Sequence, residues 1–280
     1  MTNSANDVLL RFENVTIRFD DLTAVNNVSF QMTAGETRVI LGSAGSGKTT
    51  LLKAAIGLIP VDSGRVYLMG RDITNLAERQ LFDIRSQVGV LFQEGGLFDS
   101  INIEENVGYP LVNRKTHADS PDQVHTKVVN ALRFVELAHT LEKYPNELSG
   151  GMRRRVGIAR AVITEPPLVL YDSPTAGLDP ITATTIMALV AKERDSLNAA
   201  NLIVTQRYQD GQLMANFRYN RINEHLEPVS NDLGDPDGSN PTRTTFMVMK
   251  EGHLIFEGTQ ARLEASTDAY ISKFVPQHHN

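Results

Sequence analysis

The sequence contains no cysteine at all. Without a thiol there is no disulfide, no zinc–thiolate centre and no cysteine nucleophile, so those classes of scaffold and enzyme are excluded. It also lacks any apolar run near the roughly 18 residues that a membrane-spanning helix needs. The first residues, Met1 to Asp7, are polar and lack the basic-then-apolar pattern of a signal peptide. If the protein acts at a membrane, we expect it to dock onto a partner already embedded there.

Positive charge is in short supply as well. The sequence has 27 Lys and Arg against 33 Asp and Glu, which gives a formal net charge of −6 at pH 7. A mildly acidic chain is a poor default ligand for nucleic acid, so we expect no nucleic-acid partner. With 280 residues, of which 41% are hydrophobic, the chain is long and apolar enough for one large α/β domain with a packed core.

Short apolar runs alternate with helical stretches, which predicts a largely parallel sheet covered by helices. A helix is expected from Lys48 to Leu58, and a mostly helical region from about Glu94 to Tyr144. The predicted strands are Val8 to Phe19, Val28 to Met32, Thr37 to Leu41, Val88 to Phe92, Leu168 to Tyr171, Leu202 to Val204, and Thr245 to Phe256 with a turn at Glu251-Gly252.

A glycine-rich loop follows one of these strands and precedes a helix. Glycines let the backbone curl until successive N–H groups face a polyphosphate, and the helix adds its positive N-terminal end. In this pattern, G-x-x-x-x-G-K-[ST], Lys48 supplies a cation for the β and γ phosphates and Thr49 a hydroxyl for Mg²⁺. The loop and its flank comprise Gly42, Ser43, Ala44, Gly45, Ser46, Gly47, Lys48, Thr49 and Thr50. We therefore predict an ATP site.

A second motif supports the first. The apolar run from Leu168 to Tyr171 ends in Asp172. A carboxylate at the end of a buried strand beside a P-loop is placed to hold the Mg²⁺ ion and its water shell. Such a run is weak evidence alone, but together with the P-loop it indicates a nucleoside triphosphatase.

Further segments resemble the ATP-binding subunits of ABC transporters, in order and spacing, from about Val8 to Leu263. Leu148 to Met152 (LSGGM) resembles the family signature LSGGQ, with Met152 in place of Gln. Gln93 looks like the Q-loop glutamine, and Ser173 to Pro180 resembles the segment that carries the D-loop. The resemblance implies an α/β P-loop NTPase domain over residues 1–280, with a RecA-like core, an antiparallel β subdomain and a helical signature subdomain at about 94–162.

The resemblance also implies a mechanism. Two subunits close face to face, and each ATP lies between one subunit's P-loop and the other's signature, Ser149, Gly150 and Gly151. Phe19 stands where an aromatic residue of this family stacks on adenine. The implied magnesium ligands are Thr49, Gln93 and Asp172, and the implied catalytic residues are Lys48, Gln93, Asp172, Ser173 and Gln206. The expected cofactors are ATP and Mg²⁺.

A subgroup is indicated by Glu94 to Ser100, by Glu105 to Pro110 and by the SGGMRRR run. These segments resemble the Mla/Mkl group, whose members drive lipid transport between bacterial membranes. That resemblance implies an integral membrane permease, a second ATPase subunit (a homodimer) and an Mce-domain lipid-binding protein as partners. It places the chain peripherally on the cytoplasmic face of the inner membrane. We expect residues Gly95 to Pro110 to line the permease contact.

Two positions depart from the family pattern. Ser173 stands where most active members have a glutamate that accepts a proton from the attacking water, and Gln206 replaces the switch histidine. A serine hydroxyl of normal pKa is a poor general base. Three interpretations stay open: slow turnover with Gln206 orienting the water, ATP binding with little hydrolysis, or replacement of the glutamate by Asp179 or Asp210. A soluble ABC protein without a permease is a further alternative.

The stretch from Tyr208 to Thr244 is longer than the family needs at this place, and a short tail, 264–280, closes the sequence. We expect Phe217 to Tyr219 to pair with Thr245 to Met249 as extra strands, with Asn231 to Asn240 as the tip. The insertion is interpreted either as a surface loop or as a contact for a partner.

Overall fold

The computed structural model describes residues 8–113, 119–229 and 242–275. At its centre lies a six-stranded sheet in the order β12-β11-β3-β8-β7-β6, in which all neighbours from β11 to β6 are parallel and β12 is antiparallel. The strands are β3 (Thr37–Leu41), β6 (Val88–Leu91), β7 (Leu168–Asp172), β8 (Ala200–Thr205), β11 (Thr244–Lys250) and β12 (His253–Gly258).

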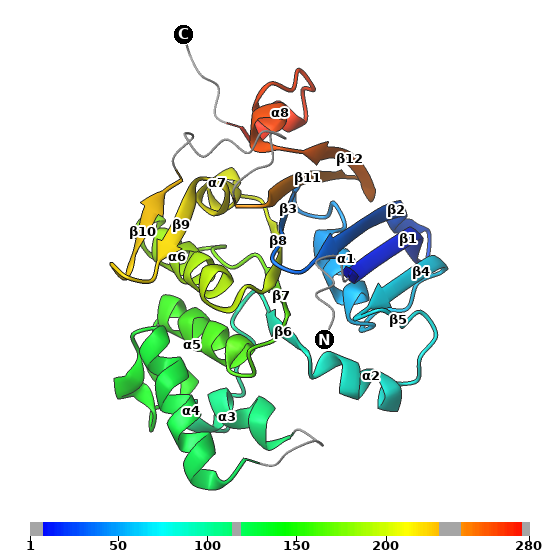
Figure 1. Ribbon diagram of the computed structural model, residues 1–280. Coiled ribbons are helices and arrows are strands. Elements are labelled where there is room, and N and C mark those ends of the chain that lie inside the picture. Colours follow the sequence, from blue (N-terminus) through cyan, green and yellow to red (C-terminus); the bar gives the residue numbers. More distant parts are fainter. Residues whose placement is uncertain (1–7, 114–118, 230–241, 276–280) are drawn as a thin grey trace, which may run out of the picture.

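Both faces of this sheet are buried, which explains why its strands are apolar runs rather than alternating ones. In β8, for example, Ile203 faces one hydrophobic core while Leu202 and Val204 face the other. α1 (Lys48–Ala55) covers the second face, and α6 (Pro180–Leu197) and α7 (Tyr208–Asn216) cover the first (Figure 1).

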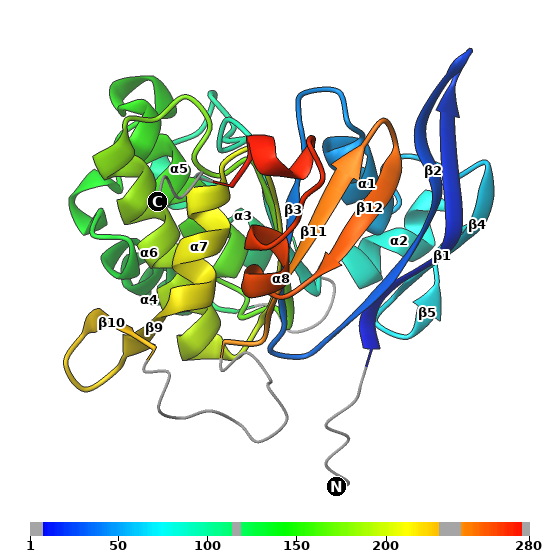
Figure 2. The ribbon, with the colours of Figure 1, turned by 90° about the horizontal axis from the view of Figure 1, so that it is seen from above.

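A second, antiparallel sheet of four strands packs beyond α1. Its order is β2-β1-β4-β5, and Figure 2 shows β1 and β2 as long strands on the side of the molecule opposite α5. The strands are β1 (Val8–Phe19), β2 (Leu22–Thr33), β4 (Ser63–Leu68) and β5 (Arg71–Asp72).

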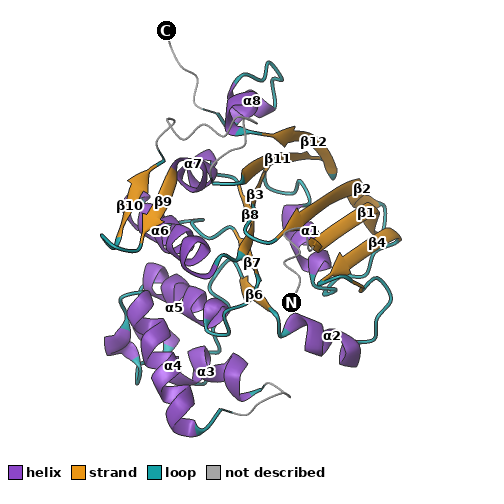
Figure 3. Cartoon of the chain, in the orientation of Figure 1, coloured by secondary structure: helices purple, strands orange, loops and turns teal. Residues whose placement is uncertain are grey.

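Helices gather on the other side of the central sheet, as the colouring in Figure 3 makes plain. α3 (Ile103–Val112), α4 (Pro121–Phe134) and α5 (Gly150–Val162) pack on one another, and α5 also packs on β6. α3 and α4 begin with capping boxes built on Asn102 and Ser120, which is why the chain turns into helices at these residues. The remaining helices are α2 (Glu78–Arg85) and the short α8 (Gln260–Glu264). None of the helices in the described ranges is long and apolar enough to cross a bilayer.

Most predicted strands are confirmed, and Val8–Phe19 and Thr37–Leu41 match in both bounds. The predicted helix from Lys48 is shorter than expected and ends at Ala55, because Gly57 adopts a left-handed φ of 66° that stops the helix.

The pairing predicted inside the insertion is wrong. β9 (Phe217–Asn220) pairs with β10 (His225–Pro228) as a separate two-stranded hairpin. The strand predicted to pair with it, β11, lies between β3 and β12 in the central sheet. β11 is apolar and buried on both faces, so it belongs to the core rather than to a surface hairpin. The predicted tip, Asn231 to Asn240, lies outside the described residues.

Candidate functional site

Four parallel strands of the central sheet end at the same edge. In register, Leu41 of β3 lies opposite Thr205 of β8, and Asp172 of β7 lies opposite Val204. Leu91 of β6 lies opposite Tyr171. The residues that follow these strands therefore meet along one line: the glycine-rich loop, Gln206, Ser173 and Gln93. This edge is where open α/β sheets bind ligands.

The loop between β3 and α1 needs glycine at two positions for lack of space. A Cβ on Gly47, whose φ is +102°, would lie 2.1 Å from the backbone oxygen of Ala24. A Cβ on Gly42 would lie 2.5 Å from the backbone oxygen of Met249. Gly45 has a φ of +75° and its Cβ would meet nothing within 4 Å, so it faces open space. The loop therefore packs against the backbone of Ala24 and Met249 at its two ends and is open to solvent at Gly45.

Lys48 is buried at the start of α1 and its ammonium group points back into the loop. Nζ donates to the backbone oxygens of Gly42 (2.7 Å) and Ser43 (2.8 Å) and to Oγ of Ser46 (3.2 Å). Burial lowers the pKa of Lys48 to about 8, and the nearby carboxylate of Asp172 offsets part of that shift. A cation held by backbone oxygens inside the loop is well placed to turn toward an incoming anion.

Two of the three residues predicted to hold magnesium, Thr49 and Asp172, lie side by side. Thr49 Oγ1 donates to Asp172 Oδ1 at 3.1 Å, and the Ser173 hydroxyl donates to the same oxygen at 3.3 Å. A hydroxyl and a carboxylate oxygen at one place form the hard oxygen set that Mg²⁺ prefers. In the described residues no side chain caps the first turn of α1, so its backbone N–H groups stay available to a phosphate. The residues present therefore fit Mg²⁺-ATP.

Phe19, the predicted adenine contact, lies at the end of β1 with 45% of its surface exposed. It pairs with Leu22 at the tip of the β1–β2 hairpin. Ala24, two residues further along β2, is the residue whose backbone oxygen abuts Gly47 of the loop. An exposed ring beside the phosphate loop is consistent with stacking on a base.

Gln93 and Gln206 are both exposed at the sheet edge. The backbone oxygen of Gln93 accepts a hydrogen bond from Nε of Arg154 at 3.0 Å, so the Q-loop is fastened to the signature helix. Both amide side chains are exposed to solvent, next to the strands that end at the loop and at Asp172.

The signature residues lie elsewhere. Ser149 caps α5, accepting from the Met152 N–H at 3.2 Å, and a Cβ on Gly151 would lie 2.7 Å from a methyl group of Thr182, so a side chain there would displace Thr182. Figures 1 and 2 both place α5 and α1 on opposite sides of the central sheet. One chain therefore brings the P-loop, Asp172, Ser173, Gln206 and Gln93 to one edge, whereas its signature helix, which contacts the backbone of Gln93, lies across the sheet from α1.

The two carboxylates suggested as substitutes for the missing glutamate are engaged in other bonds. Asp179 caps α6, accepting from the N–H groups of Ile181 and Thr182 at 3.0 Å each. Asp210 is buried, and its Oδ2 accepts from the hydroxyls of Thr205 (2.6 Å) and Thr175 (2.7 Å). Asp210 thus ties the segment after β7 to the end of β8, a link that no motif in the sequence indicates.

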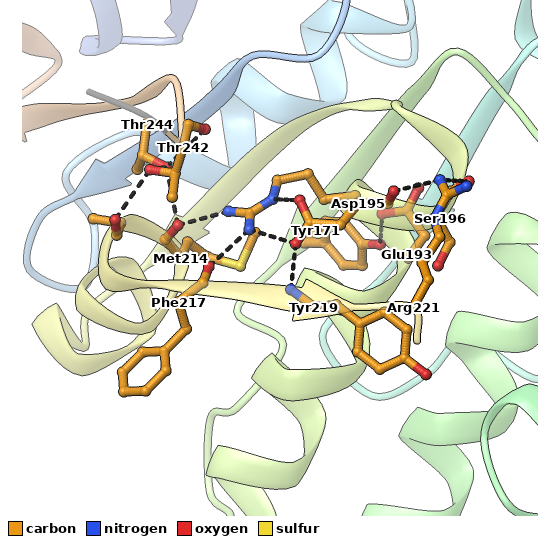
Figure 4. Close-up of polar contacts among 12 residues, drawn as sticks. Tyr171, Glu193, Asp195, Ser196, Met214, Phe217, Tyr219, Arg221, Thr242 and Thr244 are labelled. Atoms are coloured by element: carbon orange, nitrogen blue, oxygen red, sulfur yellow. Dashed lines mark hydrogen bonds and ion pairs between the residues drawn. The ribbon is translucent and has the colours of Figure 1, made fainter. Parts of the chain in front are cut away.

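Directly before Asp172, Tyr171 of β7 forms a buried polar pair with Glu193 of α6. The Tyr171 hydroxyl donates to Oε2 of Glu193 at 3.2 Å (Figure 4), and both side chains are fully buried. Burial raises the pKa of Glu193 to about 7, although Tyr171, Asn201 and Arg194 each favour the ionised form. A titratable group therefore lies in the core beneath the magnesium ligands.

The neighbouring residue on α6 anchors the β9–β10 hairpin. Arg194 donates from Nη1 to the backbone oxygen of Met214 (2.6 Å) and from Nη2 to that of Phe217 (2.8 Å), and it forms a two-pronged pair with Asp195. Asp195 in turn accepts from the Tyr219 N–H at 2.7 Å (Figure 4). These buried, charge-assisted bonds hold the hairpin on the body of the protein.

Replacing Glu193 by glutamine is expected to stabilise the protein above pH 7. The pKa is raised from 4.5 in the unfolded chain to about 7 in the folded protein. The folded state therefore binds the extra proton, so stability is lost as pH rises from about 4.5 to 7. The shift corresponds to about 3 kcal/mol at pH 8, which the neutral amide of Glu193→Gln avoids. Urea unfolding at pH 5 and pH 8 measures the difference.

The control for this prediction is the exposed Glu142→Gln, which should leave the pH dependence of stability unchanged. Identical pH profiles for wild type and Glu193→Gln would contradict the argument.

The fold and this sheet edge define a P-loop nucleotide-binding cassette, and comparison with known proteins agrees. A family model described as "ABC transporter" matches residues 25–176. The chain therefore belongs to the ABC transporter family of ATP-binding subunits.

Several curated relatives resemble the chain. It is 33% identical over 215 residues to the intermembrane phospholipid transport system ATP-binding protein MlaF of Haemophilus influenzae, covering 76% of this chain and 80% of that one. It is 35% identical over 198 residues to the probable ribonucleotide transport ATP-binding protein mkl of Mycobacterium leprae, and 39% identical over 182 residues to the methionine import ATP-binding protein MetN of Carboxydothermus hydrogenoformans. Those two matches span only 56% and 53% of the relatives' own length.

Solved structures show the same fold. A dimeric post-hydrolysis state of the ATP-binding cassette MJ0796, bound to ADP and Pi, matches with a TM-score of 0.73 and 26% identity, over 89% of this chain and 98% of that one. CbiO1 from Clostridium perfringens, part of the CbiONQ transporter complex, matches with a TM-score of 0.69 and 27% identity, over 90% of this chain and 89% of that one.

Proposed function

We propose that the protein is the Mg²⁺-dependent ATPase subunit of a membrane lipid transporter. The observation that carries the proposal is the meeting of three elements at one sheet edge: the glycine-rich loop with Lys48 inside it, the Thr49–Asp172 pair, and the exposed amides of Gln93 and Gln206. Phosphoryl transfer depends on positioning and charge stabilisation, and these groups supply both.

Each residue has a distinct part in this proposal. Lys48 would leave its backbone partners to bind the β and γ phosphates, while Thr49 and Asp172, with Gln93, would hold a Mg²⁺ ion that supplies positive charge beside the phosphates. Gln206 would orient the attacking water. Ser173, bonded to Asp172, supplies no strong base. We infer slow turnover, because Asp179 and Asp210 are engaged in other hydrogen bonds.

The separation of Ser149–Gly151 from the P-loop supports a dimer. A helix N-terminus with two glycines is suited to an anion, yet in one chain α5 lies on the opposite side of the central sheet from α1, which follows the P-loop (Figure 1). A second copy, placed face to face, would bring its signature onto this ATP. The similar cassette MJ0796 was solved as a dimer.

The proposed permease contact lies over residues Gly95 to Pro110. The rings of Phe98 and Tyr109 pack there at a tilt of 47°, with centroids 4.8 Å apart and 43% and 44% of the side chains exposed, and Arg160 lies over the Phe98 ring. A depression of about 430 Å³ opens beside them, lined by the Q-loop, α5 and the D-loop segment Ala176 to Leu178. Exposed aromatic pairs beside a hollow are typical of protein contacts.

Among possible cargoes we favour phospholipid, because the relative named for phospholipid transport is matched over most of its length. An Mce-type lipid-binding protein and a location on the cytoplasmic face of the inner membrane accompany that proposal. The second candidate function is an ATP-binding switch with little hydrolysis, which the serine at position 173 favours.

The proposal predicts that ATP affinity falls above pH 8. In the protein without ATP, Lys48 loses its proton near pH 8. The terminal phosphate of ATP, whose pKa is about 6, is already fully ionised at that pH. The apparent Kd for ATP should therefore rise by up to about tenfold per pH unit above 8. Calorimetric titration between pH 7 and 9.5 measures it.

Lys48→Met serves as the control, with weak binding that does not depend on pH in this range. A wild-type protein with no ATP binding at any pH would overturn the proposed function. Strong binding that Lys48→Met preserves would exclude the role given to Lys48.

A further inference from the structure

The segment after α8 returns to the P-loop. The hydroxyl of Tyr270 accepts from the Ser43 N–H at 3.0 Å, forms a hydrogen bond with Ser43 Oγ at 3.0 Å, and donates to the backbone oxygen of Met249 at 3.1 Å. A phenolic hydroxyl has one proton to donate and accepts through its oxygen, so all three contacts are satisfied at once. One side chain thereby joins the end of β11 to the second residue of the loop.

The Tyr270 ring is itself held in place. Asp268 Oδ1 accepts from the N–H groups of Tyr270 (2.7 Å) and Ile271 (3.0 Å), which fixes the turn, and Ile271 is buried in the core. Phe274 packs edge-on against the ring at 5.3 Å, and Lys250 lies over its face at 5.4 Å. The hydroxyl therefore reaches the loop from a supported position.

The contact lies one peptide away from the lysine of the ATP site. The N–H of Ser43 is bound by Tyr270, and the C=O of Ser43 accepts from Lys48 Nζ at 2.8 Å. Met249, the other partner of Tyr270, is the residue whose backbone oxygen excludes any side chain at Gly42. The Ser43 N–H shares a peptide unit with the C=O of Gly42, which also accepts from Lys48 Nζ, at 2.7 Å. Without the phenolic oxygen that N–H loses its partner, and rotation of this peptide unit would move the Gly42 oxygen that holds Lys48.

We infer that Tyr270 is a positioning residue for the triphosphate: its hydroxyl fixes the first turn of the P-loop in the form that receives ATP. The inference rests on the proposed ATP binding and adds to it a residue from the C-terminal segment that the loop motif does not contain.

The test is Tyr270→Phe, which keeps the ring and removes only the hydroxyl. The Kd for ATP should rise by about three- to tenfold, the loss expected for one or two hydrogen bonds. Hydrogen exchange of loop amides 42–47 should quicken, while exchange in β3 stays unchanged. If the variant hydrolyses ATP, KM should rise more than kcat falls. Tyr219→Phe, on the β9–β10 hairpin, is the matched control and should alter none of these.

The outcomes separate the two proposals. A wild-type protein that does not bind ATP would contradict the proposed function. Hydrogen exchange of the Ser43 amide would still test the contact between Tyr270 and the loop. If wild type binds ATP and Tyr270→Phe binds it equally or more tightly, the inference is overturned, whatever the exchange shows. If Tyr270→Phe does not fold, Asp268→Ala replaces it, because that change removes the hydrogen bonds that support Tyr270. Asp268→Ala must then raise the Kd for ATP, and an unchanged or lower Kd would overturn the inference.

Discussion

Replacing Ser173 by glutamate is expected to raise the rate of ATP hydrolysis by about 10²–10⁴-fold, the usual worth of a general base. Ser173 directly follows Asp172 at the end of β7, and its amide is fixed by a 2.8 Å hydrogen bond to the backbone oxygen of Val204. Ser173 already has a positive φ of 49° although it is not glycine. A glutamate at this position therefore needs no new backbone conformation. The measurement is kcat of the purified protein, together with any permease partner, at saturating Mg²⁺-ATP.

Ser173→Gln separates the basicity of the new residue from its size. Glutamine fills the same space as glutamate but accepts no proton, so it should leave kcat near the wild-type value. ATP affinity should change little in either variant, because position 173 does not hold the phosphates. A folded, ATP-binding Ser173→Glu protein with unchanged kcat would show that hydrolysis follows a route without a base at this position.

Replacing Gly47 by alanine is expected to weaken ATP binding by at least roughly 100-fold, the scale on which a displacement of about 1 Å acts in a preorganised site. The new Cβ would lie 2.1 Å from the backbone oxygen of Ala24 and 3.0 Å from Cε of Met249. Backbone atoms cannot yield as a flexible side chain can, so the loop itself must move. The left-handed φ of +102° adds strain of about 1–3 kcal/mol. Calorimetric ATP titration and urea unfolding measure the two effects.

Gly70→Ala is the matched control for backbone strain. Gly70 has a φ of +72° in the turn between β4 and β5, and a Cβ there would meet nothing within 4 Å. It should lower stability slightly and leave ATP affinity unchanged. An ATP affinity of Gly47→Ala within a few-fold of wild type would contradict the argument from space.

Local sequence patterns predicted the parts of the site that depend on neighbouring residues. The apolar run Thr37–Leu41, the glycines after it and the helix from Lys48 lie within one stretch, and the strand ending in Asp172 needs only its own pattern. Their meeting at one edge follows from the parallel arrangement that alternating strands and helices impose.

Contacts between distant segments were not predictable in the same way. The sequence predicts a strand at Phe217–Tyr219 but not its partner. The predicted partner, β11, pairs with β3 and β12 in the central sheet instead. Tyr270 lies 227 positions from Ser43, and its segment carries no motif that would indicate the contact. Glu193 lies on a helix whose burial on the sheet determines its pKa, which the helix sequence alone does not show.

The most direct test of the account is steady-state Mg²⁺-ATP turnover of the purified chain, alone and with its membrane partner, with Lys48→Ala as the blank. Turnover per subunit should be slow but clearly above that blank, and it should increase with protein concentration, because in the proposed dimer each ATP meets the signature of the second subunit. Turnover no higher than that of Lys48→Ala in either setting, despite ATP binding, would contradict the account and leave the chain as a nucleotide-binding switch.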